Sequence, residues 1–339
     1  MTDRVLLTGI SGFLGGHIAL ALLNTGYTVR GSVRNLSKAD KVRQTLENAG
    51  ADTTNLEFVA LDLTRDEGWR EAMEGCRYLL HTASPFVIQM PRDKNELIRP
   101  AVEGTERALN AALAAGVERI VLTSSMASIA YGHDPKRTAP FTADDWTNLE
   151  GRDVTAYVES KTRAERRAWE LMKAAGREDD LVTINPSGIL GPLLDEDPGT
   201  SAAIVQRLLD GTVPAAPRVP FVIVDVRDVA AAHVAALTGD VGGKRLPIGE
   251  RPMFMFEVAQ VLRKTHADYA RKLPRFEMPD WAVRIYALFD KDIRGILGEL
   301  GIRKSLDSST AEALLGRRLI AADQAVSATA ESLIAHKLV

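Results

Sequence analysis

Short apolar runs of strand length alternate with amphipathic stretches along the first 190 residues of the chain. Strands that are apolar on both sides are typical of a parallel sheet covered by helices on its two faces. The predicted strands lie at 4–8, 28–33, 56–62, 78–83, 119–125, 181–185 and 221–225. The alternation therefore predicts an α/β fold built on a parallel sheet.

The stretches between these runs carry apolar residues at helical spacing. Leu14, Ile18 and Leu22 recur on one face after the first strand, and Gly26 is a natural C-terminal stop. A longer helix is predicted over 96–115, closed by Gly116. We therefore expect helices to connect the strands.

The pattern changes after Gly191. The segment GPLLDEDPGTSAA is loop-rich, and the last hundred residues carry prolines between amphipathic pieces, without alternating strand runs. We expect residues 1–190 to form one domain, to which 221–237 return. Residues 191–220 and 238–339 are expected to form a smaller, mostly helical lobe.

Composition and charge narrow the class of protein. The chain has 339 residues, a net charge of −3 and one cysteine, Cys76. This charge provides no basic field for nucleic acid or an anionic membrane, and a single cysteine excludes an intramolecular disulfide framework. We see no signal-peptide pattern, no run near the roughly 18 apolar residues of a membrane span, and no metal-ligand spacing among the histidines. We therefore expect a cytoplasmic protein without a metal.

A glycine-rich turn follows the first predicted strand in TGISGFLGG (8–16). Gly9 permits a tight turn, Gly12 lets backbone amides approach a pyrophosphate, and Gly15 lets the next helix pack closely. The N-terminus of that helix presents unpaired N–H groups to phosphates. The turn therefore predicts a dinucleotide site, the alternative being a turn without a ligand. Its other expected cofactor contacts are Ser11, Phe13 and Leu14.

The end of the second strand selects the cofactor. An NAD site places an acid there, about 20 residues after the glycines, to hold the ribose 2′-hydroxyl. Val33 occupies this position, Arg34 follows, and Lys38 and Lys41 come on the next turn. Cations suit a 2′-phosphate, which an acid would repel. We therefore expect NADPH/NADP+ with Arg34 and Lys41 as ligands, although Arg34 as a solvated loop cation is left open.

Tyr157 and Lys161 lie four residues apart in TAYVESKTRAE (155–165), a stretch of helical character. Their side chains would lie on one face, one turn apart. Such a pair arises by chance in about one chain of three at ordinary composition, so the spacing alone is weak evidence. It gains weight from TSSM (123–126) at a predicted strand end, the edge where ligands bind in open α/β sheets. The other charges of this stretch are expected to form a solvated face: Glu159, Arg163 and Glu165.

The motifs form an ordered set along the chain. They are TGISGFLGG, LDL (61–63), TSS (123–125), YVESK (157–161), NPSGILGP (185–192) and VDVRDVAAAH (224–233). This set resembles the extended short-chain dehydrogenase/reductase family, and HTASPF (81–86) with VRGSVRN (29–35) resembles its dihydroflavonol 4-reductase-like branch. The resemblance implies a Rossmann-type, doubly wound parallel sheet with a smaller, mostly helical C-terminal substrate lobe.

The resemblance also assigns Ser125, Tyr157 and Lys161 as the catalytic group. A tyrosine phenol, with an ordinary pKa of about 10, is a reluctant proton donor and acceptor at neutral pH, and a nearby cation makes it more acidic. The resemblance implies that Tyr157 and Lys161 also contact the cofactor, Lys161 at the nicotinamide ribose, and that Ser125 hydrogen-bonds the substrate oxygen. The further cofactor contacts that it implies are Asp62, Leu63, Ala83, Ser84, Pro186 and Ser187.

One position in the expected proton relay departs from the family pattern. Many members begin the long fourth helix with an asparagine that relays protons to the lysine, whereas alignment on VEGT (102–105) places Ala101 there. Proton delivery would then need water or another group.

Candidate contacts to an apolar or aromatic substrate are Phe86, Met126 and Tyr131, with plain core packing as the alternative.

Together these observations predict NADPH-dependent reduction of a small-molecule aldehyde or ketone to the alcohol. One alternative is an NAD-dependent sugar-nucleotide epimerase or dehydratase, against which stand the cations after Val33 and the absence of an acid directly after Ser125. The other alternative is a non-catalytic NADP-sensing protein, which the intact catalytic group makes less favourable. We expect a monomer or homodimer with no nucleic-acid or membrane partner.

Overall fold

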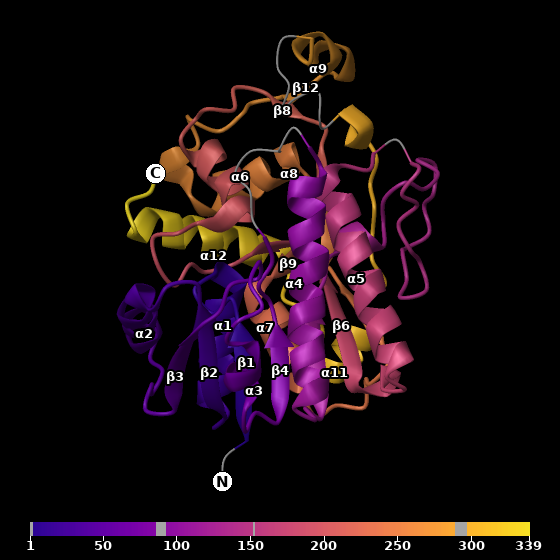
Figure 1. Cartoon of the computed structure of the whole chain (residues 1–339). Coiled ribbons are helices and arrows are strands. Elements are labelled where there is room, and N and C mark those ends of the chain that lie inside the picture. The colour runs from indigo at the N-terminus through magenta and orange to yellow at the C-terminus, as the bar shows by residue number, and fades with distance from the viewer. Residues whose placement is uncertain (1–2, 86–92, 152, 289–296) are drawn as a thin grey trace.

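The computed structural model describes residues 3–85, 93–151, 153–288 and 297–339. Its centre is a seven-stranded parallel sheet with helices on both faces (Figure 1). The chain adds strands from β1 outward in both directions, which is the doubly wound arrangement that we predicted. Across the sheet the strands are β10 (Arg245–Ile248), β6 (Leu181–Pro186), β5 (Arg119–Thr123), β4 (Tyr78–His81), β1 (Arg4–Thr8), β2 (Thr28–Val33) and β3 (Leu56–Ala60).

Three strands of the large sheet end earlier than predicted. β1 and β2 have the predicted bounds, whereas β3, β4 and β5 each end two residues before the predicted end. Asp62, Ala83 and Ser125 therefore lie beyond the sheet, in the loops at its carboxyl edge. Apolar character continues past the last ladder bond in these runs, so the pattern alone overestimates strand length.

The strand predicted over 221–225 forms but does not join the large sheet, whereas the helix after it packs in the core of that sheet. β9 (Pro220–Asp225) pairs with β7 (Gly188–Leu190) and β11 (Arg251–Phe254) in a separate three-stranded sheet. The edge strand beside β6 is β10, from a range that we assigned to the smaller lobe. This strand has only four residues, one of them Pro247, and an edge position tolerates such a proline. It was too short to read as a strand in the sequence.

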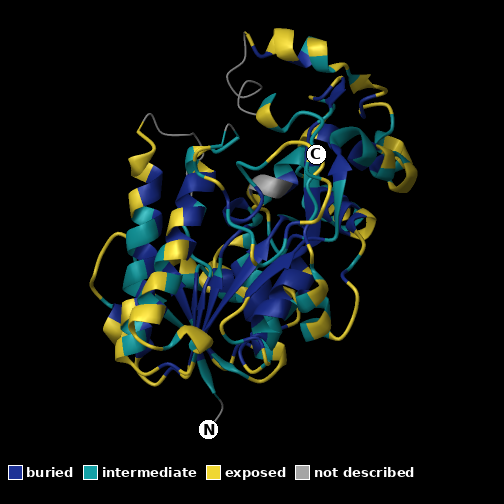
Figure 2. Ribbon diagram, turned by 90° about the vertical axis from the view of Figure 1, so that its right-hand side faces the viewer, coloured by how far each residue is buried: buried dark blue, intermediate teal, exposed yellow. Residues whose placement is uncertain are grey.

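Helices cover the large sheet on both faces, and each layer buries its own apolar core. One core joins the sheet to α1 (Phe13–Asn24), α2 (Ala39–Asn48), α7 (Val226–Ala235) and α11 (Ser309–Leu315). The other joins it to α3 (Trp69–Met73), α4 (Asn95–Ala114) and α5 (Ala156–Ala174). Figure 2 shows the strands buried between these layers. The helix predicted over 96–115 is α4, and Gly116 follows it with a φ of +69°.

A third core lies beyond the carboxyl edge of the large sheet (Figure 1). It is formed by the three-stranded sheet with α6 (Gly199–Leu209), α8 (Met255–Thr265) and α12 (Ala322–Ala335). Farther from the sheet lie β8 (Ala216–Pro217), β12 (Glu277–Met278) and α9 (Asp280–Tyr286). The 3-10 helices are η1 (Leu36–Lys38), η2 (Met126–Ser128), η3 (Glu178–Asp180), η4 (Ala267–Tyr269) and η5 (Leu297–Glu299). No helix in the described ranges is both long and apolar enough to cross a bilayer.

Candidate active site

The turn between β1 and α1 is as close-packed as its glycines allow. Gly9 has a φ of +74°, and a Cβ on it would lie 3.0 Å from the backbone of Ala83. A Cβ on Gly15 would lie 2.1 Å from the carbonyl oxygen of Gly9, far inside any tolerable contact. Any side chain at Gly15 would therefore push α1 away from the turn.

The N-terminus of α1 is left open to a ligand. Gly12 is its N-cap residue, no side chain caps the helix, and no acid stands in its first turn. The first N–H groups of a helix have no partner within the helix, and they attract an anion. Backbone donors that face a groove, without a competing acid, fit the pyrophosphate of a dinucleotide.

A groove extends from this turn along the ends of β2, β3 and β4. Among the predicted cofactor ligands, those that line it are Gly9, Ser11, Gly12, Arg34, Asp62, Leu63, Ala83 and Ser84. A neighbouring hollow shares Ser11 and Gly12 with the groove and adds Phe13 and Lys41. Eight of the predicted ligands thus meet in one continuous depression around the glycine turn, with Phe13 and Lys41 beside it.

Four predicted cofactor ligands lie elsewhere. Leu14 packs against the core on the α1 side of the sheet, and Gly15 is buried in the turn. Pro186 ends β6 and lies opposite Ile248 of β10. The hydroxyl of Ser187 is buried and has no hydrogen-bond partner among the described residues. None of the four lines the groove or the hollow beside it.

Charges at the end of β2 suit a phosphate. Arg34 lines the groove and makes no hydrogen bond or ion pair with any described side chain. Lys41 is mostly exposed, and its Nζ lies 4.0 Å from the carboxylate Oδ2 of Asp195. Asp62 accepts hydrogen bonds from the backbone N–H and the hydroxyl of Thr64, at 2.8 and 2.7 Å. These bonds hold the pKa of the Asp62 carboxyl below its ordinary value, and the charge of Arg34 adds to them.

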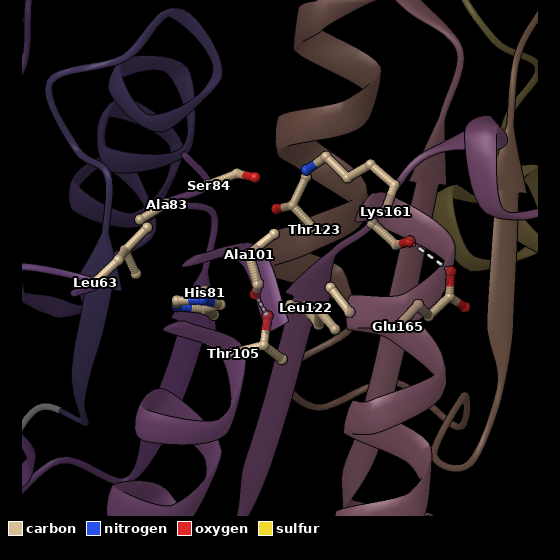
Figure 3. A pocket seen from close by; sticks show the side chains of 12 residues that line it. Leu63, His81, Ala83, Ser84, Ala101, Thr105, Leu122, Thr123, Lys161 and Glu165 are labelled. Carbon is tan, nitrogen blue, oxygen red and sulfur yellow. Dashed lines mark hydrogen bonds between the residues drawn. The ribbon is translucent and has the colours of Figure 1, made fainter. Parts of the chain in front are cut away.

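Tyr157 and Lys161 lie at the start of α5, at the same edge of the sheet. Thr155 caps this helix by accepting a hydrogen bond from the N–H of Val158, and Tyr157 is 41% exposed. Lys161, one turn on, lines a small pocket together with Ala83 and Ser84, and Figure 3 shows its side chain pointing toward Ser84. Because Ala83 and Ser84 also line the groove, the lysine lies where the groove meets α5.

Ala101 and His81 form the floor of this pocket (Figure 3). His81 is 1% exposed, and its Nδ1 shares a hydrogen bond of 2.9 Å with the hydroxyl of Thr8. Burial, with the charge of Lys161 added, lowers the pKa of His81 to about 3. The imidazole is therefore neutral at physiological pH.

Ser125 stands two residues beyond β5, as the N-cap residue of η2. Its hydroxyl oxygen accepts a hydrogen bond of 3.1 Å from the N–H of Ala127. Its carbonyl oxygen accepts bonds from the N–H and the hydroxyl of Ser128, at 3.0 and 2.8 Å. The bond from Ala127 uses the hydroxyl oxygen only as an acceptor, so the hydroxyl proton of Ser125 is free to be donated.

Two of the three predicted substrate contacts lie together in the structure. Met126 and Tyr131 pack against one cluster of buried residues that includes Ile129 and Phe141. Burial raises the pKa of the Tyr131 phenol, and electrostatic interactions with Glu299 and Tyr157 act in the same direction. The ammonium of Lys304 lies 3.6 Å from the centre of the Tyr131 ring. Phe86 lies outside the described residues.

The expected solvated face of α5 is wrong for two of its three charges. Arg163 is exposed, but Glu159 is 8% exposed and pairs with Lys94 and Arg163 at 2.9 and 2.8 Å. Glu165 is 1% exposed and pairs with Arg245 of β10. The spacing in the sequence could have indicated that Glu165 faces the same way as the catalytic pair, because it follows Tyr157 and Lys161 at four-residue intervals on one helix face.

Known proteins resemble this chain over most of its length. The family model of the NAD dependent epimerase/dehydratase family matches residues 5–249. Cinnamoyl-CoA reductase CAD2 of Medicago truncatula is 34% identical over 81% of this chain and 82% of its own length. Ketoreductase azaE of Aspergillus niger is 33% identical over 88% of this chain and 93% of its own. The structure of Gre2 from Candida albicans in complex with NADPH is 26% identical, with a TM-score of 0.79 over 98% of this chain and 99% of Gre2.

These likenesses cover the glycine turn, the sheet and the helix that carries Tyr157 and Lys161. They also extend over the C-terminal lobe, where our motifs had ended, because the Gre2 match spans nearly the whole chain. The chain belongs to the NAD-dependent epimerase/dehydratase family, the extended short-chain dehydrogenases/reductases that its sequence motifs resemble.

Proposed function

We propose that this protein is an NADPH-dependent reductase that converts an aldehyde or ketone to the alcohol, with an apolar or aromatic carbonyl compound as substrate. The observation that carries the proposal is the continuity of the site. Leu63, Ala83 and Ser84 line both the groove at the glycine turn and the pocket that contains Lys161. A dinucleotide held at the turn therefore extends toward Tyr157. The reductase names of the relatives support the same reaction.

The residues of the groove fit the proposed cofactor. The N–H groups at the start of α1 would hold the pyrophosphate, and Arg34 with Lys41 would hold the 2′-phosphate. No acid stands at the end of β2 to repel that phosphate. When bound, NADPH supplies the hydride that reaches the carbonyl carbon.

The protein's own part in the reaction is to give a proton to the carbonyl oxygen. Tyr157 is 41% exposed near the start of α5, one helical turn before Lys161, and its phenol is the proposed donor. Lys161 would stabilise the phenolate that remains, because a cation one helical turn away favours the charged form. Ser125 would donate its free hydroxyl proton to the substrate oxygen as negative charge develops there.

A Tyr157→Phe variant tests the catalytic assignment. Removal of the hydroxyl leaves the ring and its packing but deletes the proton donor, so we expect kcat to fall by about 100-fold or more. NADPH affinity, measured by calorimetric titration, should stay within about twofold because no groove residue changes. Turnover is followed by NADPH absorbance on a panel of aromatic and aliphatic aldehydes and ketones.

Tyr286→Phe is the matched control, because that tyrosine is 60% exposed on α9 at the far end of the smaller lobe. We expect wild-type turnover for it. Near-normal turnover of Tyr157→Phe would remove the tyrosine from the mechanism. A wild-type protein that binds NADPH but reduces no member of the panel would contradict the proposed function itself.

A further inference from the structure

The carboxylate of Glu165 lies at the centre of a buried polar network. Its Oε2 accepts hydrogen bonds from the hydroxyls of Ser124 and Ser128, and from the side-chain amide of Asn185 at 2.7 Å. Its Oε1 accepts from the hydroxyl of Thr183 at 3.0 Å and from Nε of Arg245 at 2.6 Å. These donors come from β6, β10 and the loop after β5, so one side chain of α5 ties three neighbouring parts of the sheet together.

Arg245 is itself fixed on every side. Its Nη1 donates to the carbonyl oxygens of Ala143 and Asp145, at 2.7 and 2.6 Å. The guanidinium stacks 3.7 Å from the centre of the Trp146 ring and is 8% exposed. Burial alone would raise the pKa of Glu165, but the charge of Arg245 and the hydrogen bonds hold it below its ordinary value. The carboxyl is therefore ionised at neutral pH.

This network encloses the turn that presents Ser125. The two hydroxyls bound by Oε2 belong to Ser124, which directly precedes Ser125, and to Ser128, which ends η2. The hydroxyl oxygen of Ser128 also lies 2.8 Å from the carbonyl oxygen of Ser125, so its single proton is shared between this oxygen and the carboxylate. The side-chain amide of Asn185 lies 3.4 Å from that carbonyl oxygen and 3.0 Å from the Ser128 hydroxyl. The direction in which Ser125 points thus depends on groups that the carboxylate holds.

α5 carries both ends of this arrangement. Tyr157, Lys161 and Glu165 follow one another at intervals of four residues, so they lie along one face of the helix. Figure 3 shows Lys161 and Glu165 on the same side of α5. Glu165 accepts the hydrogen bond from Ser124 on this face. A rigid helix therefore links the proposed proton donor to the anchor of the serine turn.

We infer that Glu165 is a positioning residue, which sets the hydroxyl of Ser125 relative to the phenol of Tyr157 by clamping the serine turn to α5. The inference rests on the proposed function, because it gives Ser125 its role toward the substrate oxygen. A hydrogen bond to a developing oxyanion is sensitive to alignment, and a displacement of about 1 Å can cost about 100-fold in rate. A carboxylate that accepts hydrogen bonds from both ends of the turn restricts its position more than a single neutral hydrogen bond would.

The test is a double-mutant cycle between Glu165→Gln and Ser125→Ala. If Glu165 acts through Ser125, Glu165→Gln should lower kcat by about 10- to 100-fold, and adding it to Ser125→Ala should lower kcat little further. NADPH affinity should stay within about twofold. If the two losses multiply, or if Glu165→Gln keeps kcat within about twofold, the inference is overturned.

Glu159→Gln is the matched control. Glu159 lies on the same helix and is also buried, but its partners are Lys94 and Arg163, away from the serine turn. We expect its kcat to stay near that of the wild-type protein. A loss as large as that of Glu165→Gln would mean that any buried charge on α5 has this effect, and it would contradict a specific role for Glu165.

Ser128→Ala is the gentler second variant, because it removes one hydroxyl of the network and leaves the ion pair between Glu165 and Arg245 intact. We expect a smaller loss of kcat, about 3- to 10-fold, that also vanishes in the Ser125→Ala background. Additive losses in that background would overturn the inference even if Glu165→Gln does not fold.

Hydrogen exchange of the peptide that spans 124–130 gives a readout that does not need turnover. The amides of this turn should exchange faster in Glu165→Gln than in the wild-type protein, and at the wild-type rate in Glu159→Gln. Unchanged exchange in Glu165→Gln overturns the inference. A wild-type protein without turnover on any carbonyl compound would instead contradict the proposed function, and faster exchange would still support the clamp.

Discussion

Two turns at the carboxyl edge of the sheet are shaped by opposite means. The turn after β1 is shaped by missing side chains, since a Cβ at Gly15 would lie 2.1 Å from the Gly9 carbonyl oxygen. The turn after β5 is shaped by crowded polar side chains, with Ser124 and Ser128 both bound to the buried carboxylate of Glu165. The clash at Gly15 involves only neighbours in the sequence, whereas the second turn needs partners up to 121 positions away (Ser124 to Arg245, through Glu165).

The difference has a physical reason. The first turn presents backbone N–H groups to a phosphate, and close approach is achieved by removing atoms. The second presents one hydroxyl at a set angle, and an angle is fixed by bonds from several directions. We expect the first turn to fail when an atom is added and the second to fail when a bond is removed.

Gly15→Ala should have the largest effect. The added Cβ forces α1 away from the turn by about 1 Å, which should lower kcat/KM for NADPH by about 100-fold and reduce thermal stability. Gly16→Ala is the control, because its Cβ would approach the side chain of Leu194 at 3.3 Å and no backbone atom more closely than 3.9 Å. Calorimetric titration with NADPH separates the two variants, and equal affinities would contradict the steric account of the turn.

Arg34→Ala should have an intermediate effect that is confined to one cofactor. Loss of a charge-assisted hydrogen bond to the 2′-phosphate should raise the KM for NADPH by about 10- to 100-fold. The KM for NADH should hardly change, because NADH lacks that phosphate, and it serves as the internal control. Equal changes for the two cofactors would show that Arg34 holds the turn rather than the phosphate.

The stability of the fold should also respond to acid, through the buried His233 of α7. Burial lowers the pKa of His233 to about 4, although its hydrogen bond to the Val229 carbonyl works the other way. The unfolded chain binds a proton at this histidine below pH about 6.5, whereas the folded chain does so only below about 4. Stability from this group is therefore complete above pH 6.5 and is lost as the pH falls toward 4.

A His233→Gln variant measures this contribution. Its melting temperature should fall less between pH 6.5 and 4 than that of the wild-type protein, although the remaining His81, with a pKa lowered to about 3, keeps part of the decline. We expect the smallest effect here, a change in slope rather than a loss of activity at neutral pH. Parallel melting curves across this window would contradict a neutral, buried His233.

The sequence predictions succeeded where a feature depends on residues close in the sequence and failed where it depends on distant ones. The strand-turn-helix at the N-terminus was predictable because its strand is a run of buried apolar residues and its glycines lie within seven positions. The edge strand β10 was not, because four residues with a proline carry too little pattern. Glu165 was misassigned because a charged residue on a helix is usually solvated, and only the partners brought by β6 and β10 make its burial tolerable.

The sequence by itself determined the parallel sheet, the glycine turn and the helix face that carries Tyr157 and Lys161, because each depends on residues a few positions apart. Only the tertiary structure decided which strand closes the sheet, and that Arg245 of this strand meets Glu165 beneath the serine turn. Burial of a charge is set by all the groups that surround it, and those groups come together only when the chain has folded.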